Sequence, residues 1–89
     1  MMKIYPNPAR SLAYVSIPAE MKKGGNMIIR NKVGEIIQEC IFSENNAHVI
    51  PVDLTGHPAG FYNVALADEV SEISAELLNL VESDNTVVV

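Results

Sequence analysis

The residues of this chain that are able to do chemistry are few, and they do not group in the sequence. The single cysteine is Cys40, and the two histidines, His48 and His57, lie nine positions apart. A histidine metal site needs further ligands at helical or hairpin spacing, and neither histidine has one. Cys40 stands among isoleucines, where a small buried side chain is expected rather than a reactive thiol, and a lone cysteine forms no internal disulfide.

The acidic residues offer no catalytic pair either. Asp53 precedes a turn, where a carboxylate commonly accepts backbone N–H bonds. Asp68, Glu69, Glu72 and Glu76 lack the spacing of a calcium loop, so we expect them to form a solvated edge. A phosphate-binding glycine loop and a Gly-x-Ser-x-Gly elbow are also absent from the sequence. The residues therefore indicate a non-enzymatic protein with no catalytic, metal-binding or cofactor-binding site and no cofactor.

Charge is divided sharply along the chain. All six basic residues precede Val33, where Glu20 is the one acid, and the other acids follow. The formal net charge is -5, which excludes the basic footprint that nucleic-acid binding requires. Two explanations remain open. Basic and acidic strands lie side by side and neutralise one another, or a partner or a second copy docks on a polar surface, which would give weak self-association.

Length and composition point to one folded domain. A chain of 89 residues with 48% hydrophobic and 19% charged residues is ordinary for a single globular domain. No apolar run approaches the roughly 20 residues of a transmembrane helix, and the N-terminus does not resemble a signal peptide. We expect residues 1–89 to form a single β-sandwich domain.

Residues 53–66 are the stretch around which the other elements are expected to pack. Apolar side chains alternate around its start at Ile50, Val52 and Leu54, and again within it after residue 60, with the period of a half-buried strand. Between the two runs, residues 55–60 supply two glycines and one proline. These residue types predict a corner that joins two strands.

The remaining chain alternates between β-rich runs and turns at intervals of roughly ten residues, which is typical of an antiparallel sandwich. Residues 12–17 place Ala13, Val15 and Ile17 on one face, and residues 18–25 read as a surface loop. Residues 27–42 predict a hairpin that turns at residues 31–34, with Gly34 at positive φ. Residues 70–81 fit either a helix or a strand with Asn79 discordant, and we favour the strand because it covers a sheet edge. Residues 86–89 form a tail or a short extra strand.

Three blocks of the sequence resemble the C-terminal sorting domains of the type IX secretion system, type A. They are Lys-Ile-Tyr-Pro-Asn-Pro-Ala at residues 3–9, Ile-Arg-Asn-Lys-Val-Gly-Glu-Ile-Ile at 29–37, and Val-Asp-Leu at 52–54 with Pro-Ala-Gly-Phe-Tyr at 58–62. The blocks occur in the order of the family, and the resemblance spans residues 3–81, with 82–89 as a tail.

The resemblance implies an immunoglobulin-like antiparallel β-sandwich of about seven strands at the C-terminus of a larger exported protein. Such a domain is recognised by the outer-membrane translocon in the periplasm, travels with its preceding cargo to the cell surface or is secreted, and is cleaved by a sortase. Matching the motifs implies roles for the sorting-motif residues. Tyr5, Pro6, Asn7, Pro8 and Ala9 would form the first strand and its stiff entry. Gly34 would form the hairpin turn, Gly60 with Tyr62 would form the corner and its buried aromatic, and Leu54 belongs to the same corner block.

Two alternatives stay open at this stage. The motif residues either are recognised by the secretion machinery or recur because they fold the sandwich.

The chain also differs from the family pattern, because residues 76–89 contain no lysine or arginine where the family commonly has one near its end. The alternative function is an immunoglobulin-like adhesive or spacer module of a bacterial surface protein. A carbohydrate-binding module is disfavoured, because few aromatic residues are present and several are needed inside.

Overall fold

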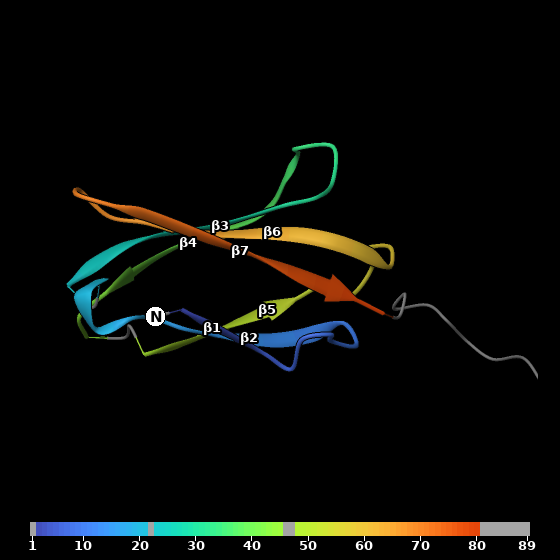
Figure 1. Ribbon diagram of the computed structural model, residues 1–89, viewed down its shortest axis with the longest axis horizontal. Helices are drawn as coiled ribbons and strands as arrows, with labels where there is room; N and C mark the ends of the chain where they lie inside the picture. The colour runs from blue at the N-terminus through green and yellow to red at the C-terminus, as the bar shows by residue number, and fades with distance from the viewer. Residues whose placement is uncertain (1, 22, 46–47, 81–89) are drawn as a thin grey trace, which may run out of the picture.

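The computed structural model describes residues 2–21, 23–45 and 48–80, which form two antiparallel sheets packed face to face (Figure 1). The three-stranded sheet has the order β1-β2-β5 and the four-stranded sheet has the order β4-β3-β6-β7. Sequence and structure therefore agree on an all-β sandwich of seven strands. The elements are β1 (Lys3–Tyr5), β2 (Leu12–Ser16), the 3-10 helix η1 (Ala19–Met21), β3 (Gly24–Arg30), β4 (Ile36–Ser43), β5 (Val49–Asp53), β6 (Gly60–Ala67) and β7 (Glu72–Asn79).

The core lies between the two sheets and is built by the alternating apolar positions that the sequence predicted. Val15 and Val52 face inward from the three-stranded sheet, and Met27, Val64 and Leu77 face them from the four-stranded sheet. Each fully buried side chain of this size contributes about 1.5–3 kcal/mol by leaving water. Because side chains alternate between faces, this burial also fixes the register of each strand.

The segment predicted as a surface loop, residues 18–25, is only partly one. Met21, in η1, is buried against the core, and β3 already begins at Gly24. Gly25 runs so close to β6 that a Cβ atom placed on it would lie 2.2 Å from the Ala67 carbonyl oxygen. The two glycines therefore belong to a strand whose neighbour approaches closely, rather than to a loop. Local composition misled the prediction because tertiary contact overrides loop propensity.

Residues 72–79 form a strand, β7, so the strand prediction is confirmed and the helical alternative is wrong. β7 covers one edge of the four-stranded sheet by pairing with β6 along its whole length. Asn79 is not discordant, because it is fully buried on the same inward face as Leu77. The predictions for Val81 and for residues 86–89 lie outside the described residues. No described helix is long and apolar enough to cross a membrane.

Candidate functional site

The three sequence blocks meet at one end of the sandwich. They occupy the β1–β2, β3–β4 and β5–β6 connections, and in this antiparallel fold those connections share one end with the last residues of β7 (right-hand side of Figure 1). We call this the motif end and define it as residues 6–11, 31–35, 55–61 and 76–80. Topology therefore gathers segments that are widely separated in the sequence.

The segment after β1 is bonded to β7 as if it were a further strand. The Asn7 side chain donates from Nδ2 to the Glu76 carbonyl oxygen at 2.9 Å and accepts at Oδ1 from the Leu78 N–H at 3.0 Å. Two residues later, the Ala9 N–H donates to the Leu78 carbonyl at 2.8 Å, and the Leu80 N–H donates to the Ala9 carbonyl at 2.9 Å. Ala9 is fully buried. Residues 7–9 thus cover the free edge of β7, which would otherwise expose unpaired backbone groups.

The β5–β6 corner is held by Tyr62, as in the tyrosine corners of immunoglobulin-like sandwiches. Its hydroxyl donates to the Pro58 carbonyl oxygen at 2.5 Å, and its ring is buried. Leu54, also buried, donates its N–H to the Ser11 carbonyl at 2.6 Å. Gly60 has a φ of 140°, in the region that favours glycine. The predicted buried aromatic and strand-joining corner are both present.

Asp53 closes the start of this corner as the sequence predicted. Its Oδ1 accepts the Thr55 N–H at 2.9 Å. Bonds from the Thr55 side chain and backbone, with a smaller contribution from the charge of His57, hold the pKa of the Asp53 carboxyl below its ordinary value. Asp53 therefore acts as a turn residue.

The β3–β4 turn is organised by Asn31. Its Oδ1 accepts the N–H groups of Val33 at 3.1 Å and Glu35 at 2.9 Å, and its Nδ2 donates to the Glu35 carboxylate at 2.8 Å. Gly34 has a φ of 94°, and a Cβ atom added to it would meet no neighbouring atom within 4 Å. Its backbone conformation, rather than the space around it, therefore requires glycine. The predicted positive φ is confirmed.

A groove of about 210 Å³ separates this turn from the corner. The residues that line it come from two of the three sequence blocks. Most of them are apolar, and one of them, Lys32, is a cation. Phe61 and Val33 are 52% and 72% exposed, although both are large apolar side chains. Lys32 and His57 also line the groove. The motif end thus presents apolar side chains and a positive charge to solvent, a combination suited to contact with another protein.

The predicted motif residues divide into two groups by burial. Ala9, Leu54 and Tyr62 are buried and hold the fold together, and Asn7 is exposed but is engaged by β7. The exposed members that remain available are Tyr5, Pro6, Pro8 and Gly34, with Gly60 half-buried. Tyr5 packs beside Tyr14 on the outer face of the three-stranded sheet, with ring centroids 6.0 Å apart.

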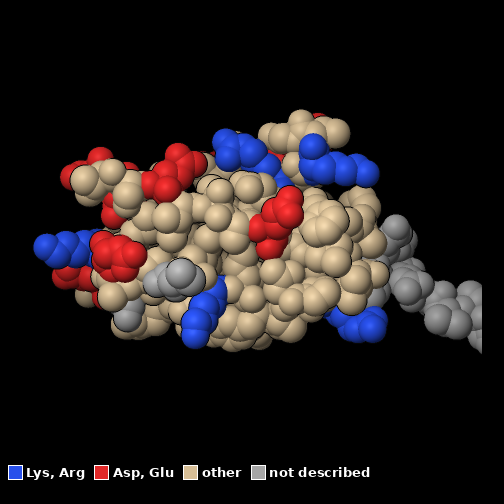
Figure 2. Space-filling model, viewed as in Figure 1, with Lys and Arg blue, Asp and Glu red and all other residues tan. Residues whose placement is uncertain are grey.

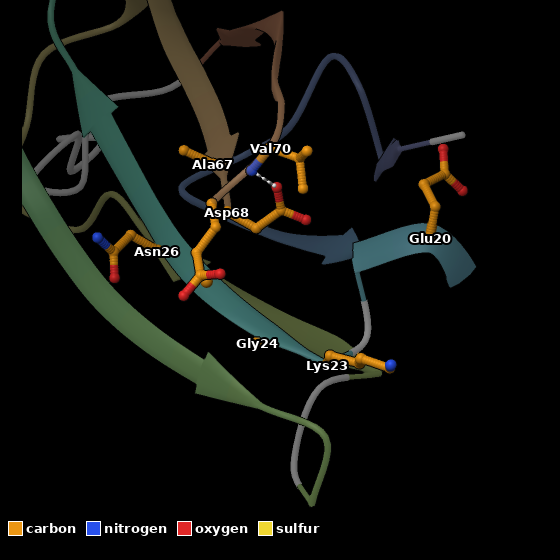
Figure 3. Close-up of a pocket in the computed structure, with 9 residues that line it drawn as sticks. Glu20, Lys23, Gly24, Asn26, Ala67, Asp68 and Val70 are labelled. Carbon is orange, nitrogen blue, oxygen red and sulfur yellow. Dashed lines mark hydrogen bonds between the residues drawn. The ribbon is translucent and has the colours of Figure 1, made fainter.

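The opposite end of the sandwich holds a wider groove of about 640 Å³ that contains no residue of the three blocks (Figure 3). Glu20, from η1, and Asp68, from the β6–β7 turn, line it but stand well apart. Asp68 Oδ1 accepts the N–H groups of Val70 at 2.9 Å and Ser71 at 2.8 Å, and these bonds hold the pKa of the Asp68 carboxyl below its ordinary value. Within the described residues no three metal-ligating side chains come together.

Charge is also unequal between the two ends. Figure 2 shows acidic side chains crowded over the end where β7 begins, together with a cation, whereas Lys and Arg predominate where β7 finishes. The strand register does not pair bases with acids, because Lys3 lies opposite Ser16, and Arg30 lies opposite Ile36 and Asn63. Neither of these two strand bases therefore lies directly opposite an acid, and the neutralisation of neighbouring strands stays a prediction.

Asn79 is the residue of this site that the sequence interpretation missed. It is the one polar residue classed as buried among those described, and its side chain bonds both the β1–β2 connection and the corner. The sequence did mark this residue, because the polar Asn79 interrupts the apolar pattern of residues 73–81. A polar residue on an apolar face is informative because burial forces it to find partners.

Comparison with known proteins agrees with this geometry. No curated protein matches the chain significantly. The family model described as a secretion system C-terminal sorting domain matches residues 3–79, which begins at the first residue of β1 and ends at the last residue of β7. The chain therefore belongs to the C-terminal sorting domains of the type IX (Por) secretion system, a non-catalytic family whose members direct the export of the cargo that carries them.

Proposed function

We propose that the motif end is the surface through which the outer-membrane translocon recognises this domain in the periplasm. The observation that carries the proposal is the convergence of three separate family blocks on one end that exposes Phe61, Val33 and Lys32 around a groove. Exposed apolar side chains beside a cation supply both contact area and electrostatic orientation for a protein partner. The acidic opposite end carries none of the three blocks.

The buried motif residues mainly support this surface from beneath, and among the three only Tyr62 also lines the groove. Ala9, Leu54 and Tyr62 place the connections, and the exposed residues of the same connections make the contacts. The two explanations of the motif are thus complementary, because a recognition surface on loops needs a rigid scaffold beneath it.

The test is export of a periplasmic reporter that carries a signal peptide at its front and residues 3–89 at its end, in a host with a working type IX system. We expect the unaltered fusion to reach the cell surface or medium. Phe61→Ser is expected to lower export by about tenfold, equivalent to about 1.4 kcal/mol of lost recognition. The matched control is Val70→Ser, because Val70 is 88% exposed at the opposite end.

A second pair of variants tests the charge. Lys32→Glu at the motif end is expected to lower export, whereas Lys23→Glu at the opposite groove is expected to leave it unchanged. Each variant must keep the thermal unfolding midpoint of the parent, so that folding is not the variable. A reporter left in the periplasm by the unaltered fusion, or equal export from both pairs, would overturn the proposal.

We further propose that a sortase removes the domain after export and that the cargo then stays at the cell surface or is released. The support for this step is family membership, since the domain is a signal without an activity of its own. An exported reporter should therefore be shorter than its periplasmic precursor by about the length of the domain. An exported reporter that keeps the domain intact would contradict cleavage and leave translocon recognition unaffected.

A further inference from the structure

Asn79 is the last residue of the last strand, and it is fully buried at the motif end. Its amide Oδ1 accepts the Ser11 N–H at 2.8 Å, and its Nδ2 donates to the Pro58 carbonyl oxygen at 3.4 Å. One side chain therefore contacts the β1–β2 connection and the β5–β6 corner, two of the three family blocks or their direct continuations. A buried amide is stable only when such bonds are made.

The two residues that bond the Asn79 side chain also take part in other hydrogen bonds of the motif end. The Pro58 carbonyl also accepts the Tyr62 hydroxyl, and the Ser11 carbonyl accepts the Leu54 N–H. Ser11 has a φ of 71°, an uncommon conformation for a residue other than glycine, which the surrounding bonds must hold in place. Asn79 thus connects β7 to the bonds that shape the corner and the turn before β2.

The backbone of Asn79 ties it to the same two segments. Asn79 pairs with Gly60 in the β6–β7 ladder and forms an isolated parallel bridge with Ala9. A slip of β7 by one residue would turn the Asn79 amide outward and bring its neighbour to the inner face. The amide would then lose Ser11 and Pro58, so these bonds select one register of β7.

We propose that Asn79 is a positioning residue that makes the shape of the motif end depend on correct docking of β7. With β7 in register, Asn79 holds the residue 6–11 connection and the corner together, and the recognition surface exists. With β7 absent or out of register, these connections lose their shared anchor. This inference rests on the proposed function for its consequence, which is that the secretion machinery reads the domain only once its last strand is in place.

The structural part is tested by amide hydrogen exchange in the whole 89-residue chain. Asn79→Leu keeps a side chain of similar size but removes the Oδ1 acceptor of the Ser11 N–H. We expect exchange of the Ser11 and Ala9 amides to become at least about tenfold faster relative to core amides. Val64→Ala is the control, since Val64 is fully buried in the middle of β6 and pairs there with Ile29 and Ala75, away from the motif end. It should lower overall protection while leaving the ratio between motif-end and core amides unchanged.

Asn79→Asp separates the hydrogen bonds from simple packing. A neutral carboxyl can accept from the Ser11 N–H and donate to the Pro58 carbonyl, whereas an ionised one cannot donate. Burial raises the pKa of the new carboxyl above its unfolded value, so the bond donated to the Pro58 carbonyl is present at low pH and is lost as pH rises through that raised pKa. Above it, the buried charge also repels the Pro58 carbonyl oxygen, which drives the side chain out of its site and away from the Ser11 N–H. Ser11 and Ala9 exchange should match the parent at about pH 4 and be at least about tenfold faster at about pH 7.5.

Other groups titrate or carry charge on the segments around Asn79, and they are controlled by measuring the parent chain at each pH. These groups are Arg10 in the β1–β2 connection, Asp53 and His57 at the corner, and Tyr62 in β6, together with Glu76 in β7. All are present in every variant, so a pH dependence confined to Asn79→Asp belongs to residue 79. Parent-like protection of Ser11 and Ala9 in Asn79→Asp at the higher pH would overturn the inference.

The export assay keeps the two proposals apart. Loosening of the motif end in Asn79→Leu together with lost export supports both. Loosening with unchanged export supports the positioning role and overturns recognition through the motif end. A motif end that stays protected in Asn79→Leu overturns the positioning role, whatever the export result.

Discussion

The two ends of this sandwich are built by different means, although the same strands supply both. At the motif end, side chains bond backbone groups across segments: Asn7 reaches β7, and Asn79 reaches both Ser11 and Pro58. At the opposite end, the side-chain bonds of the Asp68 turn are local, and the bond from the Ile17 N–H to the His48 carbonyl oxygen, which does join distant segments, is a backbone bond. Bonds between distant segments hold connections in fixed relative positions, whereas local bonds only shape each turn.

The difference explains how a domain without catalytic residues can carry information. A surface made of connections is recognisable only if those connections keep one arrangement. The motif end uses buried polar groups to achieve this, and Asn79 is the clearest example because it is buried on an otherwise apolar face. The opposite end joins strands and has an open groove, and the side-chain bonds of its Asp68 turn stay within residues 68–71.

The largest expected effect compares one glycine at each end. Gly25→Ala places a Cβ atom 2.2 Å from the Ala67 carbonyl oxygen, so β3 and β6 must separate, and we expect a loss of about 3 kcal/mol or more in the free energy of unfolding. Gly34→Ala meets no neighbouring atom but stays at positive φ, which costs about 1–2 kcal/mol. Urea unfolding measures both. Equal losses would mean that the close approach of β3 to β6 relaxes easily.

The next effect concerns the corner. Tyr62→Phe keeps the buried ring and removes the hydroxyl bond to Pro58, so we expect the free energy of unfolding to fall by about 1.5 kcal/mol. Tyr14→Phe is the control, because Tyr14 lies half-exposed on the outer face of β2, where a surface change stays within about 0.5 kcal/mol. Thermal unfolding followed by circular dichroism distinguishes them. An unchanged Tyr62→Phe domain would show that Asn79 alone holds the Pro58 carbonyl.

A smaller effect is expected at the turns. Asn31→Ala removes the side-chain bonds to Val33 and Glu35, and we expect a loss of about 1 kcal/mol. Asn45→Ala changes the same residue type in the β4–β5 connection at the opposite end, where we expect no comparable loss. Chemical unfolding of both variants at the same pH checks the difference. Equal losses would remove this distinction between the two ends.

The smallest effect is one in which the two ends should behave alike. Asp53 at the motif end and Asp68 at the opposite end both have a pKa lowered by hydrogen bonds to the following residues. Their stabilising contribution is present above the unfolded pKa and is lost as pH falls through the lowered folded pKa, hence below about pH 4. Asp53→Asn and Asp68→Asn should each make the acid-induced fall of the unfolding midpoint slightly shallower. A change in only one variant would show that the turns are not equivalent.

Family membership decides between the functions that the residues alone left open. The sorting function follows from the match over residues 3–79, and it stands in place of the adhesive or spacer alternative. The family commonly has a lysine or arginine near its end, and residues 76–89 of this chain contain neither. Of this segment, the structure describes residues 76–80.

The aromatic residues are less internal than expected, since Tyr5, Tyr14 and Phe61 are exposed and only Phe42 and Tyr62 are buried.

The sequence by itself determined the strands, most of the turns and the family. Period-two alternation marks strands such as β2 and β5 because one face of each is buried, and Gly34 marks a positive φ because other residues avoid it. These are local signals, readable within a few residues.

Tertiary structure alone decided which connections meet and which polar residues hold them. Gly25 appeared to belong to a loop until β6 was placed against it, and Asn79 appeared discordant until Ser11 and Pro58 were brought to it. Neither partner is near in sequence, so no local pattern could indicate it. The physical reason is that a close backbone approach and a buried hydrogen bond are properties of two segments together, and only the folded sheets bring these segments into contact.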